Sequence, residues 1–128
     1  MTPVQLGRFG EWRAAWFYRL RGYSIIARNL RLRSGEIDLV VERGATIVIA
    51  EVKTRQTLIA GEGHEAVDRK KRERMIRLGD QYAAKHPYAQ LRYDILSIFW
   101  NGRRFLVTHY ADAFRPVADP QRPWIWRA

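Results

Sequence analysis

Residues 35–53 read GEIDLVVERGATIVIAEVK, and this stretch decides the fold. Two runs rich in Val, Ile and Leu, 36–41 and 47–53, predict β-strands. The five residues between them, 42–46, are few enough for a hairpin. Residues 47–50 are apolar on both faces, which is typical of a central strand. The sequence therefore predicts a hairpin at the centre of a sheet.

A helix is predicted upstream of this hairpin, over residues 3–21, followed by a strand over 23–32. Thr2 is a preferred N-cap, Pro3 suits the first helical position, and Gly22 follows the expected end. At helical spacing the side chains form two stripes, so we expect contacts on two sides of the helix. The stripes are Phe9, Trp12, Trp16 and Leu20, and, with mostly small residues, Gly7, Gly10, Ala14, Phe17 and Tyr18.

Four further elements are predicted downstream of the hairpin. They are a loop over 54–63, a helix over 64–86, and strands over 93–100 and 103–110. Asn101-Gly102 indicates a type I′ turn between the last two strands. The order αβββαββ predicts an α/β domain with a mixed central sheet over residues 1–115. Residues 116–128 contain three prolines and predict an extended tail.

Composition and charge limit the function of the chain. Its 128 residues suit one domain, and the lack of cysteine excludes disulfides, thiolate metal sites and cysteine nucleophiles. No apolar stretch approaches the roughly 20 residues of a bilayer span, so we expect a cytoplasmic protein with no membrane partner. A net charge of +10 points to a polyanionic partner. Residues 36–68 carry a net −4 between basic segments of +6 and +8, which suits carboxylates that hold a cation beside phosphates.

The charged residues inside the hairpin carry the most specific chemical signal. If the hairpin register is centred between Gly44 and Ala45, Asp38 lies opposite Glu51 with Cβ atoms ~5 Å apart. Lys53 shares the face of Glu51, because side chains alternate along a strand. Two opposed carboxylates on a partly buried face repel each other unless they are protonated or bridged by a cation.

A divalent cation suits this pair of carboxylates. Mg²⁺ uses one or two carboxylates plus substrate phosphate oxygens, so Asp38, Glu51 and the backbone carbonyl of Val52 suffice on the protein side. Mg²⁺ or Mn²⁺ there polarises a phosphate, while Lys53 orients the attacking water or neutralises developing charge. The pattern predicts metal-assisted phosphodiester hydrolysis. The alternative is a solvated strand face with an ordinary cross-strand ion pair.

Basic residues near the acidic pair indicate where nucleic acid binds. Arg55 follows Lys53 by two positions and is therefore expected near the metal. The second helix opens with a basic run that can contact phosphates, although a solvated helix face is a competing interpretation of each residue. From this run we assign Arg69, Lys70, Lys71 and Arg74 to nucleic-acid binding. The chain has no base-reading or Walker motif, so we expect recognition by shape and no nucleotide cofactor.

Several motifs resemble, in order, those of the YraN family of small bacterial proteins. They are Gly10-Glu11, Gly22-Tyr23, Asn29, Gly35 to Leu39, Glu51 to Arg55, Val67 with Lys71 and Arg74, Arg92-Tyr93-Asp94, and His109 to Phe114. The resemblance covers roughly residues 5–115. It implies a restriction-endonuclease-like αβββαβ core similar to that of archaeal Holliday junction resolvases. In that core Asp38, Glu51 and Lys53 match the metal and catalytic residues, and Glu11 matches a catalytic carboxylate on the first helix.

Three functional hypotheses follow. The first is a Mg²⁺-dependent, structure-selective DNA endonuclease that acts on branched DNA. Symmetric cutting of a four-way junction would require a homodimer. The second is a non-catalytic nucleic-acid-binding protein that keeps the nuclease fold. The third is a protein whose charge serves a ribosomal or other anionic protein partner.

Overall fold

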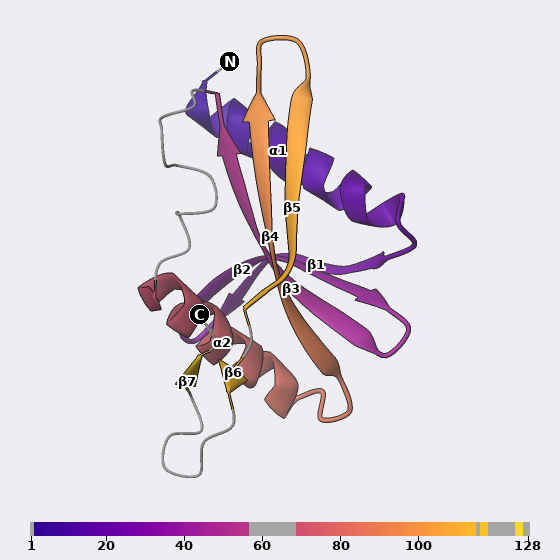
Figure 1. The fold of residues 1–128 in the computed structure, drawn as a ribbon, viewed down its shortest axis with the longest axis vertical. Coiled ribbons are helices and arrows are strands. Elements are labelled where there is room, and N and C mark those ends of the chain that lie inside the picture. The colour runs from indigo at the N-terminus through magenta and orange to yellow at the C-terminus, as the bar shows by residue number, and fades with distance from the viewer. Residues whose placement is uncertain (1, 57–68, 115, 118–124, 127–128) are drawn as a thin grey trace.

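A computed structural model of the chain describes residues 2–56, 69–114, 116–117 and 125–126. It contains β1 (Ser24–Leu32), β2 (Gly35–Arg43), β3 (Thr46–Arg55), β4 (Gln90–Trp100) and β5 (Phe105–Phe114). These strands form one mixed sheet in the order β1-β2-β3-β4-β5, in which only the β3–β4 pair is parallel (Figure 1). The predicted mixed α/β fold is confirmed, with β3 as the central strand.

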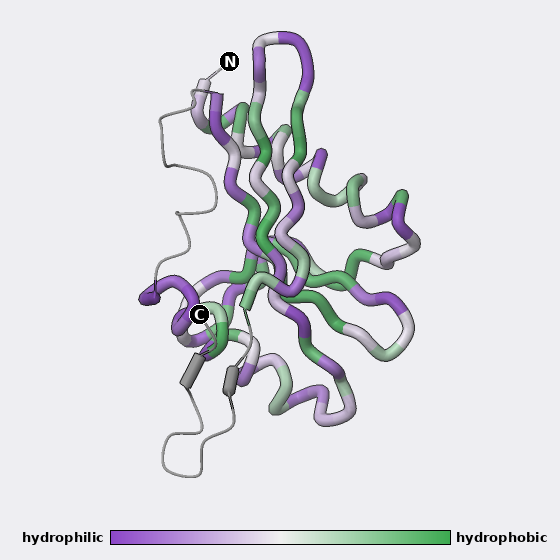
Figure 2. The backbone as a smooth tube through the Cα atoms, in the orientation of Figure 1, coloured by the Kyte–Doolittle hydropathy of each residue, from purple (hydrophilic) through white to green (hydrophobic). Residues whose placement is uncertain are grey.

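Two helices cover opposite faces of the sheet, α1 (Pro3–Arg19) and α2 (Arg69–Ala84) (Figure 1). Each helix packs against one face of the sheet and forms a separate hydrophobic core there. Strand β3 is buried on both faces, so Ile47 and Ile49 belong to one core and Val48 and Ala50 to the other. Figure 2 shows the hydrophobic residues gathered along β3 and β4, with hydrophilic residues at the tip of the β4–β5 hairpin. The double burial explains the continuous apolar run in the sequence.

The predicted start of α1 is confirmed, whereas the expected contacts on two sides are found on one: the stripe of mostly small residues packs on the sheet, and the other stripe is exposed. The Thr2 side chain accepts a hydrogen bond from the Gln5 N–H, and the Gln5 side chain accepts one from the Thr2 N–H, which completes a capping box. A Cβ at Gly10 would overlap the side chain of Thr54, so glycine allows α1 to approach β3 closely. The helix ends at Arg19, two residues before the predicted end, and Gly22 follows with φ +88°.

The inner face of α2 is closely packed where the structure describes it. Met75, Leu78, Gly79 and Tyr82 are buried, whereas Val67 and the predicted start of the helix at 64 lie outside the described residues. The helix ends at Ala84, and the ring of His86 hydrogen-bonds the carbonyl of Tyr82 at 3.0 Å. His86 therefore caps the C-terminal end.

The predicted type I′ turn at Asn101-Gly102 is wrong. Trp100 pairs with Phe105, so four residues connect β4 and β5 instead of two. A type I′ turn needs positive φ at both central residues, and among the non-glycine residues that the structure describes only Asn29 and Asp112 have positive φ. Instead the Asn101 side chain accepts hydrogen bonds from the N–H groups of Arg103 and Arg104, and this local bonding selects the longer loop.

Beyond β5, two short strands pair antiparallel, β6 (Pro116–Val117) and β7 (Ile125–Trp126). They are the described part of the predicted tail, and the division at residue 115 stays a prediction. Among the residues that the structure describes, no helix is both long enough and apolar enough to cross a bilayer.

Candidate functional site

The hairpin of β2 and β3 brings Asp38 and Glu51 to the same part of the sheet. The ladder has the predicted register, from Arg43 opposite Thr46 to Leu39 opposite Ala50. The pairing ends there, one step before Asp38 and Glu51. In place of a backbone carbonyl, the Asp38 carboxylate accepts a hydrogen bond from the Val52 N–H at 2.9 Å. The ladder between the two strands thus ends where the charged residues begin.

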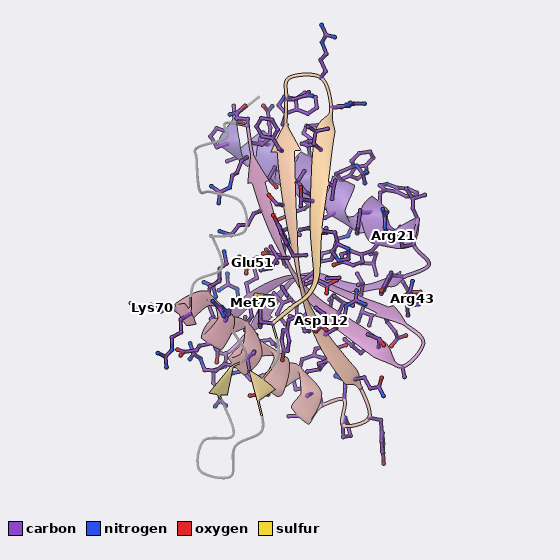
Figure 3. All side chains as sticks on the ribbon, viewed as in Figure 1. Arg21, Arg43, Glu51, Lys70, Met75 and Asp112 are labelled. Atoms are coloured by element: carbon purple, nitrogen blue, oxygen red, sulfur yellow. The ribbon has the colours of Figure 1, made fainter. Side chains whose placement is uncertain are left out.

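Glu51 lies between β3 and the N-terminal end of α2. It shares a small hollow with Asp38, and the apolar side chains of Met75 and Leu78 line the hollow from α2. Figure 3 shows Glu51 near Met75, with Lys70 at the outer end of the helix. The Glu51 side chain is only 15 % exposed, so its charge needs a cation close by.

Two basic side chains of α2 supply that charge. Lys71 Nζ lies 2.7 Å from Glu51 Oε1, and a terminal nitrogen of Arg74 lies 3.6 Å from Glu51 Oε2. The Lys71 side chain is 16 % exposed, so it points into the site and not to solvent. Sequence reasoning placed both residues on a phosphate-binding helix face, and it missed their contact with Glu51. The spacing of three residues was the available signal, because it puts both on one side of a helix.

The other predicted nucleic-acid contacts lie at different places. Arg69 is exposed and pairs with Glu73 at 3.1 Å, one helical turn away, while Lys70 is exposed. Arg55 is partly buried at the end of β3, where its charge acts on Lys53. The five basic residues therefore divide into an outer group on α2 and an inner group around the carboxylates.

Asp38 is a carboxyl group in an environment that disfavours its charged form. Burial raises the pKa of Asp38 to about 6; the hydrogen bond from Val52 opposes this shift, and the charges of Glu51 and Glu11 add to it. Lys71 lowers the pKa again, but its charge is the weakest of these influences. A cation beside Asp38 would stabilise its ionised form.

Lys53 also lies where its charged form is disfavoured. Burial lowers the pKa of Lys53 to about 8, and the neighbouring Lys71 and Arg55 lower it further, while Glu51 acts in the opposite direction. A lysine that titrates near neutral pH can donate a hydrogen bond to a phosphate oxygen or exchange a proton with water. Its position two residues after Glu51 brings it to the same cluster, as the alternation predicts.

Glu11 reaches the site from α1. Its carboxylate accepts a hydrogen bond from the Asn29 side chain at 3.4 Å, and its charge contributes to the raised pKa of Asp38. The close approach of α1 at Gly10 thus brings a third carboxylate toward the hairpin. Among the described residues, however, no three His, Cys, Asp or Glu side chains lie close enough to hold a metal together.

The donor set still fits Mg²⁺ or Mn²⁺. Such an ion needs only one or two carboxylates from the protein, and it takes the remaining ligands from water and phosphate. Asp38 and Glu51 supply hard oxygen donors; burial is the main cause of the raised pKa of Asp38, and the charges of Glu51 and Glu11 add to it. The residues that would hold the ion are the two carboxylates and the backbone carbonyl of Val52.

A second buried carboxylate, Asp94, was not assigned any role from the sequence. It is 0 % exposed and accepts hydrogen bonds from Tyr18 (2.8 Å), from two nitrogens of Arg92 (2.9 and 2.8 Å) and from the Asp112 N–H (2.9 Å). The ring of His109 bonds it at 2.7 Å. The available signal was an aspartate inside an otherwise apolar strand.

Comparisons with known proteins agree with the motifs. Residues 10–98 match the model of the Uncharacterised protein family UPF0102. A UPF0102 protein of Parafrankia sp. (strain EAN1pec) is 45% identical over 97 residues, which cover 74% of this chain and 82% of that protein. One from Nocardia farcinica is 40% identical over 112 residues, which cover 85% and 88%. One from Prosthecochloris aestuarii is 36% identical over 122 residues, which cover 89% and 96%.

Proposed function

The chain belongs to the UPF0102 family, the YraN family that its motifs resemble, and from the geometry of its site we propose that it is a metal-dependent endonuclease that cuts structured DNA. One observation carries the proposal. Asp38 and Glu51 lie beside each other where the ladder between β2 and β3 ends, and burial and the neighbouring carboxylates raise the pKa of Asp38 to about 6. Carboxylates that are purely structural are normally neutralised by their neighbours.

Asp38, Glu51 and the Val52 carbonyl would hold the divalent ion. When bound, such an ion supplies Lewis-acid chemistry, because it polarises a phosphate oxygen and makes water more acidic. The Val52 N–H fixes the Asp38 carboxylate in place through a 2.9 Å hydrogen bond, so little reorganisation is needed before the reaction. Glu11 lies close enough for its charge to act on Asp38, and it orients water at the edge of the site.

The basic side chains of the site act on the phosphate. Lys53, with a pKa of about 8, donates a hydrogen bond to the attacking water or to a phosphate oxygen. Lys71 and Arg74, which lie 2.7 and 3.6 Å from Glu51, stabilise the negative charge that develops on the phosphate oxygens. The exposed Arg69 and Lys70 contact the DNA backbone further along α2.

A second candidate function is non-catalytic nucleic-acid binding. The 2.7 Å ion pair between Lys71 and Glu51 favours it, because an ammonium group already neutralises one of the two expected metal ligands. In that case the carboxylates and basic residues form a structural cluster, and the net charge of +10 binds phosphates without cutting them.

The two functions are distinguished with a panel of single-stranded, duplex, flapped and four-way DNA substrates. Each is incubated with Mg²⁺, Mn²⁺ or chelator and with wild-type protein, Asp38→Ala or Glu42→Ala. Glu42 is the control, because it is an exposed carboxylate on the same strand that does not line the hollow of Asp38 and Glu51. We expect metal-dependent cutting of branched DNA that is lost in Asp38→Ala and kept in Glu42→Ala. Salt-sensitive binding with no hydrolysis under either metal would replace the endonuclease by the binding protein.

A further inference from the structure

The outer face of α1 exposes a row of large apolar side chains. Phe9, Trp12, Trp16 and Leu20 are 49 %, 52 %, 42 % and 73 % exposed. The inner face of the same helix is fully packed, since Ala14 and Tyr18 are both 0 % exposed. Because the inner face holds α1 on the sheet, the exposed rings contribute little to the fold. Contiguous exposed aromatics of this kind mark an interaction surface.

Arginines border this row on both sides. Arg8 precedes Trp12 by four residues, and Arg13 precedes Trp16 by three, so each lies beside an indole ring on the helix surface. The guanidinium of Arg19 lies 5.2 Å from the centroid of the Trp16 ring. The single acidic residue of the helix, Glu11, is engaged by Asn29 and acts on Asp38, away from this face. The outer face is thus aromatic and positively charged.

This charge pattern selects the partner. A second copy of the chain, placed with the same face against this one, would bring arginines against arginines with no carboxylate on α1 to pair with them. An anionic partner with flat rings satisfies both features at once. Unpaired nucleobases stack on aromatic side chains, and arginines beside them contact the phosphates.

The spacing of the rings also suits a nucleic-acid strand. A rise of 1.5 Å per residue separates Trp12 from Trp16 by about 6 Å along the helix axis. This is close to two stacking steps of about 3.4 Å along a nucleic-acid strand. Trp12 directly follows Glu11 in the chain, so the row lies on the same helix as Glu11 but on a different face.

We propose that the outer face of α1, defined by Phe9, Trp12, Trp16 and Leu20 with the flanking arginines, is a stacking platform for unpaired bases of single-stranded nucleic acid. The proposal deepens the proposed function, on which it rests for the class of partner. It explains how a protein without base-reading residues would prefer flapped DNA: a flap contains unpaired bases, whereas a continuous duplex or a four-way junction with fully paired arms has none to stack on the platform.

The test is binding in chelator, which separates it from cleavage. Fluorescence anisotropy measures the affinity for a 12-residue thymidine oligonucleotide, for an abasic oligonucleotide of the same length and for a hairpin duplex, at one fixed salt concentration. The proteins are wild type, the double variant Trp12→Leu/Trp16→Leu, and Tyr88→Ala. Tyr88 is the control, because it is an aromatic residue that is 94 % exposed outside the platform.

We expect the double variant to bind the thymidine strand at least tenfold more weakly, and the duplex less than twofold more weakly. Tyr88→Ala should bind like wild type. Wild type should bind the abasic strand as weakly as the double variant binds thymidine, and this result does not depend on how a variant folds. Equal losses for strand and duplex, or equal affinity for thymidine and abasic strands, would overturn the platform.

Two other occupants of this face would also overturn the proposal. Sedimentation that shows a dimer in wild type and a monomer in the double variant would assign the face to a second copy. Flotation with anionic phosphatidylserine vesicles that depends on Trp12 and Trp16, without single-strand binding, would assign it to a membrane surface. Failure of the proposed function gives a different result. In that case Asp38→Ala and wild type do not differ in DNA cutting, while the wild-type protein still binds the single strand in chelator.

Discussion

Asp94 and Asp38 are carboxylates in strands of the same sheet, and their surroundings differ. Asp94 is completely buried and accepts hydrogen bonds from Tyr18, Arg92 and the Asp112 N–H, with His109 beside it. Burial alone would raise its pKa, but the hydrogen bonds outweigh burial and hold the pKa of Asp94 below its usual value. Asp38 is less buried, yet its pKa is raised to about 6.

The difference lies in how completely each charge is neutralised. Asp94 has a guanidinium in bidentate contact, so its ionised form is part of the stable fold. Asp38 has the Val52 N–H as its hydrogen-bond donor among the described residues, and Glu51 and Glu11 act against its charge. A fully satisfied carboxylate is structural, whereas an incompletely neutralised one is suited to bind a cation.

Of the three substitutions discussed below, Asp94→Ala should have the largest effect, and this effect is on the free energy of unfolding. Asp94→Ala leaves Arg92, Tyr18 and His109 without their buried acceptor, so we expect a loss of ~3–5 kcal/mol in the free energy of unfolding. Urea denaturation measures it. Glu36→Ala is the matched control, because its ion pair with Arg31 is exposed and should be worth less than about 1 kcal/mol. Equal effects of the two substitutions would remove the structural role of Asp94.

Asp38→Asn should act in the opposite direction and stabilise the metal-free protein. The pKa of Asp38 is raised on folding, so the folded state favours the protonated form, and ionisation costs stability as the pH rises from about 4 to 6. Asparagine imitates the protonated form. We expect a gain of ~1–3 kcal/mol at pH 7 in chelator that disappears below about pH 4. A variant that is destabilised at pH 7 would show that the ionised carboxylate is already satisfied.

The smallest expected effect is on the affinity for Mn²⁺, and it comes from Lys71, the ammonium group that is paired with Glu51. Lys71→Met removes an ammonium group 2.7 Å from Glu51, so Mn²⁺ should bind about tenfold more tightly, equivalent to ~1.4 kcal/mol. Calorimetry measures the affinity, and Lys70→Met is the control because Lys70 is exposed on the same helix. Weaker Mn²⁺ binding in Lys71→Met than in Lys70→Met would mean that Lys71 supports the site instead of competing with the metal.

The central hairpin could be predicted from the sequence because its determinants are local. A short connection centred between Gly44 and Ala45 sets the register, and this register places Asp38 beside Glu51. The start of α1 was predictable for the same reason, because Thr2 and Gln5 form a cap within one helical turn.

Features that depend on packing between distant segments could not be predicted. Tyr18 and Asp94 are 76 residues apart, and no local pattern indicates that they meet. The contact of Lys71 with Glu51 depends on how α2 lies against the sheet, which periodicity does not determine. The turn at Asn101 was predicted wrongly because its side chain bonds two backbone N–H groups and stabilises a longer loop than the Asn-Gly pair indicates.

The most direct test is the pH titration of the Asp38 and Asp94 carboxyl carbons by ¹³C nuclear magnetic resonance, with and without Mg²⁺. A pKa of about 6 is expected for Asp38 without the ion, with a fall when Mg²⁺ is added, whereas the pKa of Asp94 should stay below its usual value in both. An Asp38 carboxyl that titrates at its ordinary pKa and does not respond to Mg²⁺ would contradict the metal site and the hydrolysis that depends on it.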